Sequence, residues 1–189
     1  MTDLPAPLAE FCDSMADAIG QFDDTSLLLD AGRQALQRLL LSDDWLPDAM
    51  AVAQEGGYQQ HLLYLDPVSR FSVVSFVWGP GQGTPIHDHC TWGLIGVLRG
   101  LEMSQAYERL PSGALVEVGA LIEGRPGAVE AVSPEVGDIH RVWNGLEDTA
   151  TISIHVYGGD IGSIDRHVFS LDGTVKPFRS GYSSRLQAH

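Results

Sequence analysis

Residues 81–100 read GQGTPIHDHCTWGLIGVLRG and place two histidines, His87 and His89, one residue apart between glycines. Side chains at positions i and i+2 of a strand project from the same face, so these two imidazoles can converge on one metal ion. A third ligand must come from elsewhere. His140 is the best candidate, because it follows a Pro and Gly turn in SPEVGDIHRVWN and opens a short strand. Three neutral imidazoles suit iron, zinc, copper or nickel and leave coordination positions open for a substrate.

The sequence around this stretch predicts a mainly β fold preceded by helices. From about residue 58 onward, short runs rich in Val, Ile, Phe and Tyr alternate with Gly, Pro and Asp, which is typical of a β-barrel or sandwich. These runs are YQQHLLYLD, FSVVSFVW, WGLIGVLRG, LEMSQAYERL, ALVEVGALIE, DIHRVWN and TISIHVYG.

Between residues 5 and 41, apolar residues recur at helical spacing and predict two helices. Gly20 is expected to end the first helix, and Asp24 or Thr25 to cap the second. The segment SDDWLPDAM suggests a short helical turn. We therefore expect a helical segment over residues 1–50 packed on a barrel over residues 51–189, in a single domain overall.

The chain is strongly acidic, with 11 basic and 25 acidic residues among 189 and a formal charge of -14. Such a charge repels phosphate backbones and anionic membrane surfaces, so neither nucleic acid nor a membrane is an expected partner. The opening lacks a basic segment followed by an apolar one, and no apolar run reaches the length of a membrane span, which favours a cytoplasmic protein. Only Cys12 and Cys90 are present, so any metal site rests on histidine.

The glycine and histidine spacing resembles the first motif of the cupin superfamily, which runs here from Gly81 to Gly100 with Gly93 at its acidic position. The second cupin motif is approximated by Pro134, Gly137, His140 and Asn144, with one extra residue between the proline and the glycine. Because Gly93 supplies no carboxylate ligand at the acidic position, a bound metal keeps its dipositive charge and favours an anionic substrate atom such as a thiolate.

From about residue 58 to residue 182 the chain resembles the cysteine dioxygenase family of cupin thiol dioxygenases. The resemblance implies a cupin, or jelly-roll, β-barrel with Fe(II) as cofactor, held by His87, His89 and His140. It also implies that Ser153, His155 and Tyr157 form a hydrogen-bonded catalytic trio. The sequence supports the trio independently, because its members alternate with Ile152, Ile154 and Val156, so that one strand face is polar and should point inward.

Two departures refine the resemblance. Gly93 stands where the animal enzymes have the cysteine that crosslinks to the tyrosine, and Cys90 is a poor substitute, so the crosslink is expected to be absent. The family's carboxylate-binding arginine falls in a segment that reads Tyr58, Gln59, Gln60 here. A glutamine there resembles the bacterial 3-mercaptopropionate dioxygenases, in which a later arginine, matched by Arg166, anchors the substrate carboxylate. Tyr58, Gln60 and Arg166 are therefore the expected substrate-binding residues.

These residues predict an enzyme that adds both atoms of O2 to the sulfur of a small thiol carboxylate, giving a sulfinate, with 3-mercaptopropionate as the favoured substrate. An L-cysteine dioxygenase on the same site remains an alternative, as does a metal-dependent isomerase, which zinc or manganese in the purified protein would favour. A non-catalytic, metal-dependent binding module is a further alternative. The sequence leaves the oligomeric state open.

Overall fold

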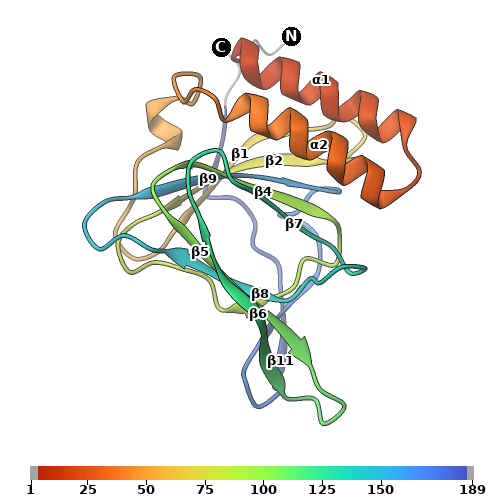
Figure 1. The fold of residues 1–189 in the computed structure, drawn as a ribbon. Helices are drawn as coiled ribbons and strands as arrows, with labels where there is room; N and C mark the ends of the chain where they lie inside the picture. Colours follow the sequence, from red (N-terminus) through yellow and green to blue (C-terminus); the bar gives the residue numbers. More distant parts are fainter. Residues whose placement is uncertain (1–3, 187–189) are drawn as a thin grey trace.

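The computed structural model describes residues 4–186 and begins with two helices that lie side by side over one face of a sheet (Figure 1). Helix α1 covers Ala6–Gln21 and α2 covers Thr25–Leu39. Asp24 caps α2 as expected, its Oδ1 accepting from the backbone N–H of Ser26 at 2.8 Å. The expectation that Gly20 ends α1 is wrong by one residue, because Phe22 still donates to the Ala18 carbonyl and continues the helical pattern.

A short 3₁₀ turn, η1 at Asp48–Met50, forms where a helical turn was predicted and leads into the strands. Seven strands coincide with the seven predicted runs, and they are β1 (Gln59–Leu65), β2 (Ser72–Trp78), β4 (Gly93–Arg99), β5 (Glu102–Arg109), β6 (Leu115–Gly124), β8 (His140–Asn144) and β9 (Thr151–Tyr157). Where a strand carrying both His87 and His89 was expected, β3 covers only Ile86–His87. Four further strands were not predicted, and they are β7 (Val129–Val132), β10 (Arg166–Phe169), β11 (Val175–Phe178) and β12 (Ser184–Arg185). All four are short, and short runs carry little periodicity.

The strands form two six-stranded sheets that face each other (Figure 1). The first has the order β12-β1-β2-β9-β4-β7 and lies under the helices, and the second has the order β11-β10-β3-β8-β5-β6. All pairings are antiparallel except that of β1 with β12. The chain crosses from one sheet to the other at most connections between consecutive strands, for example from β2 to β3, β4 and β5 and from β6 to β7, β8, β9 and β10. The polypeptide therefore winds around a shared interior in the manner of a jelly roll.

The largest apolar core lies outside this interior, between the helices and the first sheet. Leu8 and Leu36 from the helices pack there with Leu94 and Ile154 from the strands, and all four are fully buried. Helix α2 approaches β4 closely, because a Cβ atom on Gly96 would lie only 2.7 Å from the Leu40 Cδ1 atom. Burying apolar surface on this side leaves the barrel interior free for polar side chains.

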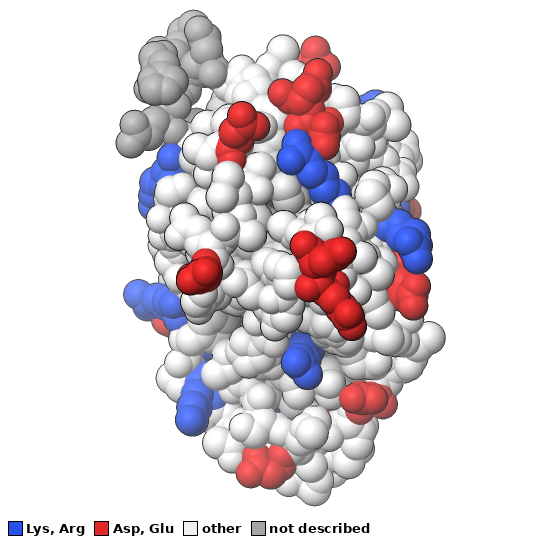
Figure 2. Space-filling model, turned by 90° about the vertical axis from the view of Figure 1, so that its left-hand side faces the viewer, with Lys and Arg blue, Asp and Glu red and all other residues white. Residues whose placement is uncertain are grey.

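Strand β9 runs through the centre of the first sheet and divides its side chains as the sequence predicted. Ile152, Ile154 and Val156 join the core under the helices, whereas Ser153, His155 and Tyr157 point to the interior. Figure 2 shows acidic and basic side chains interspersed on the face that it presents, without a continuous basic patch among the described residues there. Within residues 4–186, neither helix has the length and apolar character that a membrane span needs.

Candidate metal centre

Three histidines meet in the interior between the sheets. His87 ends β3 and pairs directly with His140, the first residue of β8. The rings of His87, His89 and His140 form a nearly equilateral triangle, with centroids 4.9, 4.9 and 4.8 Å apart. One nitrogen atom of each lies within 4.8 Å of the other two, so all three can ligate one metal ion.

Hydrogen bonds at the outer nitrogens orient these rings. The Nδ1 of His87 lies 3.1 Å from the Pro85 carbonyl oxygen, and the Nδ1 of His89 lies 2.9 Å from Asp138 Oδ1. Both oxygens only accept, so Nδ1 carries the proton in each ring and Nε2 presents its lone pair. The Nδ1 of His140 lies 3.4 Å from Ser104 Oγ. Second partners of this kind fix the tautomer and the orientation of metal-binding histidines.

The protonation states also suit a metal ion. Burial lowers the pKa of all three imidazoles, and the neighbouring imidazoles lower those of His87 and His140 further. The rings are therefore neutral at pH 7, which is the form that binds metals. The Nε2 atom of His89 is buried without a hydrogen-bond partner, and a metal cation supplies the partner that this atom lacks. The donor set therefore fits a divalent metal with open positions.

One expectation about the ligand pair is wrong. His87 belongs to β3, but His89 lies beyond the end of that strand, so the two residues do not occupy one continuous strand. The Asp138 carboxylate takes the place of a partner strand, since it accepts from the backbone N–H of His89 at 3.1 Å and of Cys90 at 2.9 Å. Cys90 then turns the chain with a φ of 55°. Sequence reasoning missed Asp138, because its partner His89 lies 49 residues away along the chain.

Gly93 lies beside the aromatic ring of Tyr157, its direct neighbour across β4 and β9. A Cβ atom on Gly93 would lie 2.8 Å from Tyr157 Cδ1, a distance that real Cβ atoms essentially never show. No side chain fits at this position while Tyr157 keeps its place. The tyrosine ring thus occupies the space next to the three histidines, and it stacks on His89 with ring centroids 5.3 Å apart.

A chain of hydrogen bonds runs along the inner face of β9. Ser153 Oγ lies 2.8 Å from His155 Nε2, and His155 Nδ1 lies 2.8 Å from the Tyr157 hydroxyl. Trp78 extends the chain, because its Nε1–H donates to Ser153 Oγ at 3.0 Å. Burial raises the pKa of Tyr157 far above its usual value, so its side chain remains a phenol with a proton to donate.

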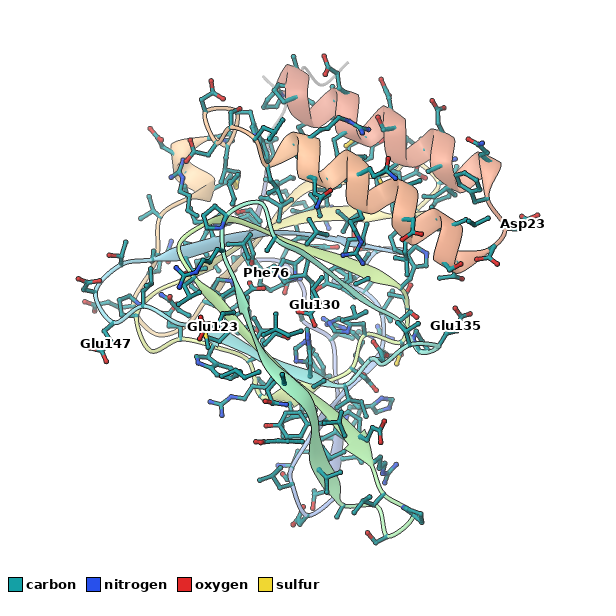
Figure 3. The ribbon with its side chains drawn as sticks, viewed as in Figure 1. Asp23, Phe76, Glu123, Glu130, Glu135 and Glu147 are labelled. Atoms are coloured by element: carbon teal, nitrogen blue, oxygen red, sulfur yellow. The ribbon has the colours of Figure 1, made fainter. Side chains whose placement is uncertain are left out.

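The histidine triad and the hydrogen-bonded chain open on the same cavity, of about 150 Å³. His87 and His140 form part of its wall, as do His155 and Tyr157. This volume accommodates several waters or one small organic molecule. Aromatic side chains exclude bulk water from one side, among them Phe76, which lies between the sheets in Figure 3.

Arg166 lines the same cavity and is only 4% exposed. Its Nη2 donates to Ser180 Oγ at 2.6 Å, and its guanidinium lies 4.5 Å from the centre of the Phe178 ring. Its Nε atom has no hydrogen-bond partner, and no acidic side chain among residues 4–186 forms an ion pair with it. Burial lowers the pKa of Arg166, but a guanidinium stays charged in proteins. The cavity therefore contains a cation that lacks an anion.

Gln60 and Tyr58 complete the end of the cavity near Arg166. Gln60 is 5% exposed, and its Nε2 donates to Ser180 Oγ at 3.1 Å, so one serine joins the glutamine to the arginine. Tyr58 packs against Trp78, with ring centroids 4.8 Å apart and ring planes tilted by 37°. The structure thus brings all nine sequence-predicted site residues to one region, and it adds Ser180, for which the sequence carries no signal.

Two tryptophans near the ligand residues lie in different places. Trp92 packs beside Gly158 and against the core under the helices, whereas Trp78 lines the cavity and donates to Ser153. Cys90 is exposed, and it forms a second cluster with Asp88 and His167. Asp88 pairs with His167 Nδ1 at 2.8 Å.

No protein-family model matches the chain. Among solved structures, an uncharacterized conserved protein with a double-stranded β-helix domain from Klebsiella pneumoniae is 16% identical, with a TM-score of 0.50, over 64% of this chain and 86% of that one. The chain has the cupin fold. A cupin superfamily protein from Desulfitobacterium hafniense (14% identity, TM-score 0.45, 59% and 86% coverage) and an oxalate oxidase (18%, 0.46, 58% and 55%) are less similar. At 16% identity, the likeness to the double-stranded β-helix domain shows the fold alone and leaves the reaction open.

Proposed function

We propose that this cupin is an iron(II) thiol dioxygenase that converts a small thiol carboxylate and O2 to the sulfinate, with 3-mercaptopropionate as the preferred substrate. The observation that carries the proposal is the combination of three convergent imidazoles and an unpaired, buried Arg166 in one cavity. One end of such a cavity binds a soft anionic atom on a metal, and the other end binds a carboxylate. A thiol carboxylate carries both groups.

The protein's own residues would bind and orient this substrate. The guanidinium of Arg166 would receive the carboxylate through charge-assisted hydrogen bonds, and Gln60 and Ser180 hold the arginine end of the cavity in place. Iron(II) bound by the three histidines would acidify the thiol and bring the sulfur and O2 together. The aromatic walls at Phe76 and Trp78 would keep bulk water away from the reacting sulfur.

Tyr157 would position the reacting atoms by donating its phenol proton in a hydrogen bond. His155 holds the tyrosine hydroxyl at 2.8 Å, Ser153 holds His155, and Trp78 holds Ser153 in turn. The overall reaction balances as thiol plus O2 giving sulfinate plus one proton. The thiol sulfur supplies the electrons, so no further reductant is required.

The cavity also favours a thiol without an amino group over L-cysteine. None of the residues that line it is Asp or Glu, so the ammonium group of cysteine would lack a carboxylate partner there. L-Cysteine therefore remains the alternative substrate, and we expect the lower catalytic efficiency for it.

The test is oxygen uptake by the iron-loaded protein with 3-mercaptopropionate and, separately, with L-cysteine, the sulfinate being identified by mass spectrometry. Tyr157→Phe should lower kcat by about a hundredfold while substrate still binds, because only the hydroxyl is lost. Tyr64→Phe is the matched control, since Tyr64 packs on the helix side of the first sheet. Preference for cysteine would reject the substrate assignment. Bound iron without uptake of oxygen would reject the enzyme and favour a binding module.

A further inference from the structure

A second cavity, of about 310 Å³, lies at the edge where the two sheets diverge. Strand β7 ends the first sheet there and β6 ends the second. The cavity is lined by apolar side chains of β4, β6 and β7 together with a few polar ones, and these residues are Arg33, Ile95, Val97, Glu102, Ser104, Ile122, Glu123, Gly124, Ala128, Val129, Glu130 and Ala131. It shares no lining residue with the catalytic cavity.

Two carboxylates enter this cavity from opposite sheets. Glu102 on β5 is only 3% exposed, and its Oε2 is buried without a hydrogen-bond partner; the nearest charged or polar group recorded for it is His155 Nε2, at 3.6 Å. Glu130 on β7 pairs with Ile95, which pairs in turn with His155, so the three side chains share the inner face of the first sheet. Figure 3 shows Glu130 between the sheets.

The cations nearby do not balance these carboxylates. Arg33 lines the cavity, and one of its Nη atoms is committed to the backbone carbonyl of Val129. Glu123 lies at the rim, where Arg125 approaches it at 3.8 Å. Against the single Arg33 stand two interior carboxylates, so the cavity retains an uncompensated negative charge. Burial and the charge of Glu102 both raise the pKa of Glu130, as expected for two acids that share one counterion.

We infer that this cavity binds a small primary ammonium ion with a short aliphatic tail. An ammonium group offers three donors, and the acceptors that face it are the carboxylates of Glu102 and Glu130 and the hydroxyl of Ser104, which lies 3.4 Å from Glu130 Oε1. The tail would lie against Ile95 and Val97, which are almost fully buried.

A divalent metal ion fits the same cavity poorly. Calcium takes six to eight oxygen ligands, and magnesium six, in a nearly ideal octahedron. Among the residues that line the cavity, only Glu102, Ser104 and Glu130 supply side-chain oxygens in the interior, since Glu123 lies at the rim beside Arg125. Much of the remaining wall consists of apolar side chains such as Ile95, Val97 and Ile122. An organic cation neutralises the negative charge of the carboxylates and also covers this apolar surface with its tail. A hydrated metal ion would leave the same surface in contact with water.

The experiment uses n-butylammonium as the probe and the metal-free protein, so that its outcome is independent of the thiol dioxygenase reaction. Isothermal titration calorimetry measures the affinity, and ¹³C-methyl NMR reports where the probe binds. We expect shifts at Ile95, Val97 and Ile122, and none at Val142 or Val168 of the catalytic cavity. Butan-1-ol, which has the same tail without the charge, should bind at least about tenfold more weakly.

Glu102→Gln and Glu130→Gln should each weaken binding by about tenfold to a hundredfold, because each removes one charge-assisted hydrogen bond. Glu123→Gln is the matched control, and it should change the affinity less than about twofold, because the Glu123 side chain is 57% exposed. Circular dichroism checks that each variant folds. If Glu102→Gln does not fold, the affinity of Glu130→Gln alone tests the site.

Any of four results would overturn the inference. They are equal binding of butan-1-ol, unchanged affinity in the folded glutamine variants, methyl shifts confined to the catalytic cavity, and no detectable binding of butylammonium. Each of these outcomes leaves the proposed dioxygenase activity untouched.

Discussion

Replacing Arg166 with methionine should make the ligand-free protein more stable and at the same time weaken carboxylate binding about a hundredfold. The guanidinium is 4% exposed and has no acidic partner among the described residues, so folding must remove an uncompensated charge from water. Such a charge costs about 3 to 5 kcal/mol. The hydrogen bond from Nη2 to Ser180 returns about 1.5 kcal/mol, and the stacking on Phe178 returns about 1 kcal/mol.

The net gain for Arg166→Met is therefore about 0.5 to 2.5 kcal/mol, since methionine fills much of the space with apolar atoms. For a chain of this size that gain raises Tm by about 1 to 10 °C. The Kd for 3-mercaptopropionate should rise about a hundredfold, because two charge-assisted hydrogen bonds are lost. Urea unfolding with and without the thiol acid measures both effects, since a ligand stabilises only the protein that binds it.

Arg179→Met is the matched control. Arg179 pairs with Asp165 on the surface, with 62% of its side chain exposed, so its loss should change stability by less than about 0.5 kcal/mol. If Arg166→Met lost more than about 1 kcal/mol of stability without ligand, the guanidinium would be compensated in the folded state. If the variant still bound the thiol acid at wild-type affinity, Arg166 would not be the carboxylate anchor.

Three other changes test the metal site, the helix packing and a surface turn. Asp138→Asn should weaken metal binding about tenfold to a hundredfold, as competition with a chelator would show, because the amide no longer holds the His89 ring as a carboxylate does; unchanged affinity would contradict this role. Gly96→Val should cost about 1 to 3 kcal/mol in urea unfolding, since its Cβ would meet the α2 side chains at 2.7 Å, and an unchanged midpoint would mean that α2 can move away. Asp66→Asn should cost about 2 kcal/mol at pH 7, because hydrogen bonds from Arg70 lower the pKa of Asp66 to about 2. Since the folded pKa lies below the unfolded value, that stabilisation is complete above about pH 4 and disappears as the pH falls through 2, so a difference that persisted at pH 2 would contradict the assignment.

The sequence was sufficient to predict the elements in which a hydrophobic pattern repeats over many residues. It was also sufficient to predict site residues whose side-chain chemistry is unusual. Alternation along residues 151–157 predicted both faces of β9, and the apolar spacing before residue 41 predicted α1 and α2. The three histidines were predicted because few other residue types at that spacing serve a metal. These signals are local, so no tertiary information was needed to find them.

The parts that the sequence did not predict depend on long-range contacts. Asp138 reaches His89 across 49 residues, and Ser180 meets Gln60 across 120, so neither partner has a local signature. Strand β3 is only two residues long, because the Asp138 carboxylate replaces a neighbouring strand beyond His87. The edge strand β7 forms because a partner strand is already in place beside it. The residue pattern within the four residues of β7 cannot reveal that partner.

The placement of the core explains how this small barrel tolerates so many polar groups in its interior. A barrel of this size is usually filled by apolar side chains, and those supply its stability. Here the helices bury the outer face of the first sheet, where Leu36 and Leu94 are fully buried. This layer supplies the buried apolar surface that the polar interior of the barrel lacks. The interior can therefore hold Arg166 and Glu102 without complete pairing. Because unpaired buried charges cost stability, their presence in two separate cavities is best explained by ligands of opposite charge, an anion in the cavity of Arg166 and a cation in that of Glu102.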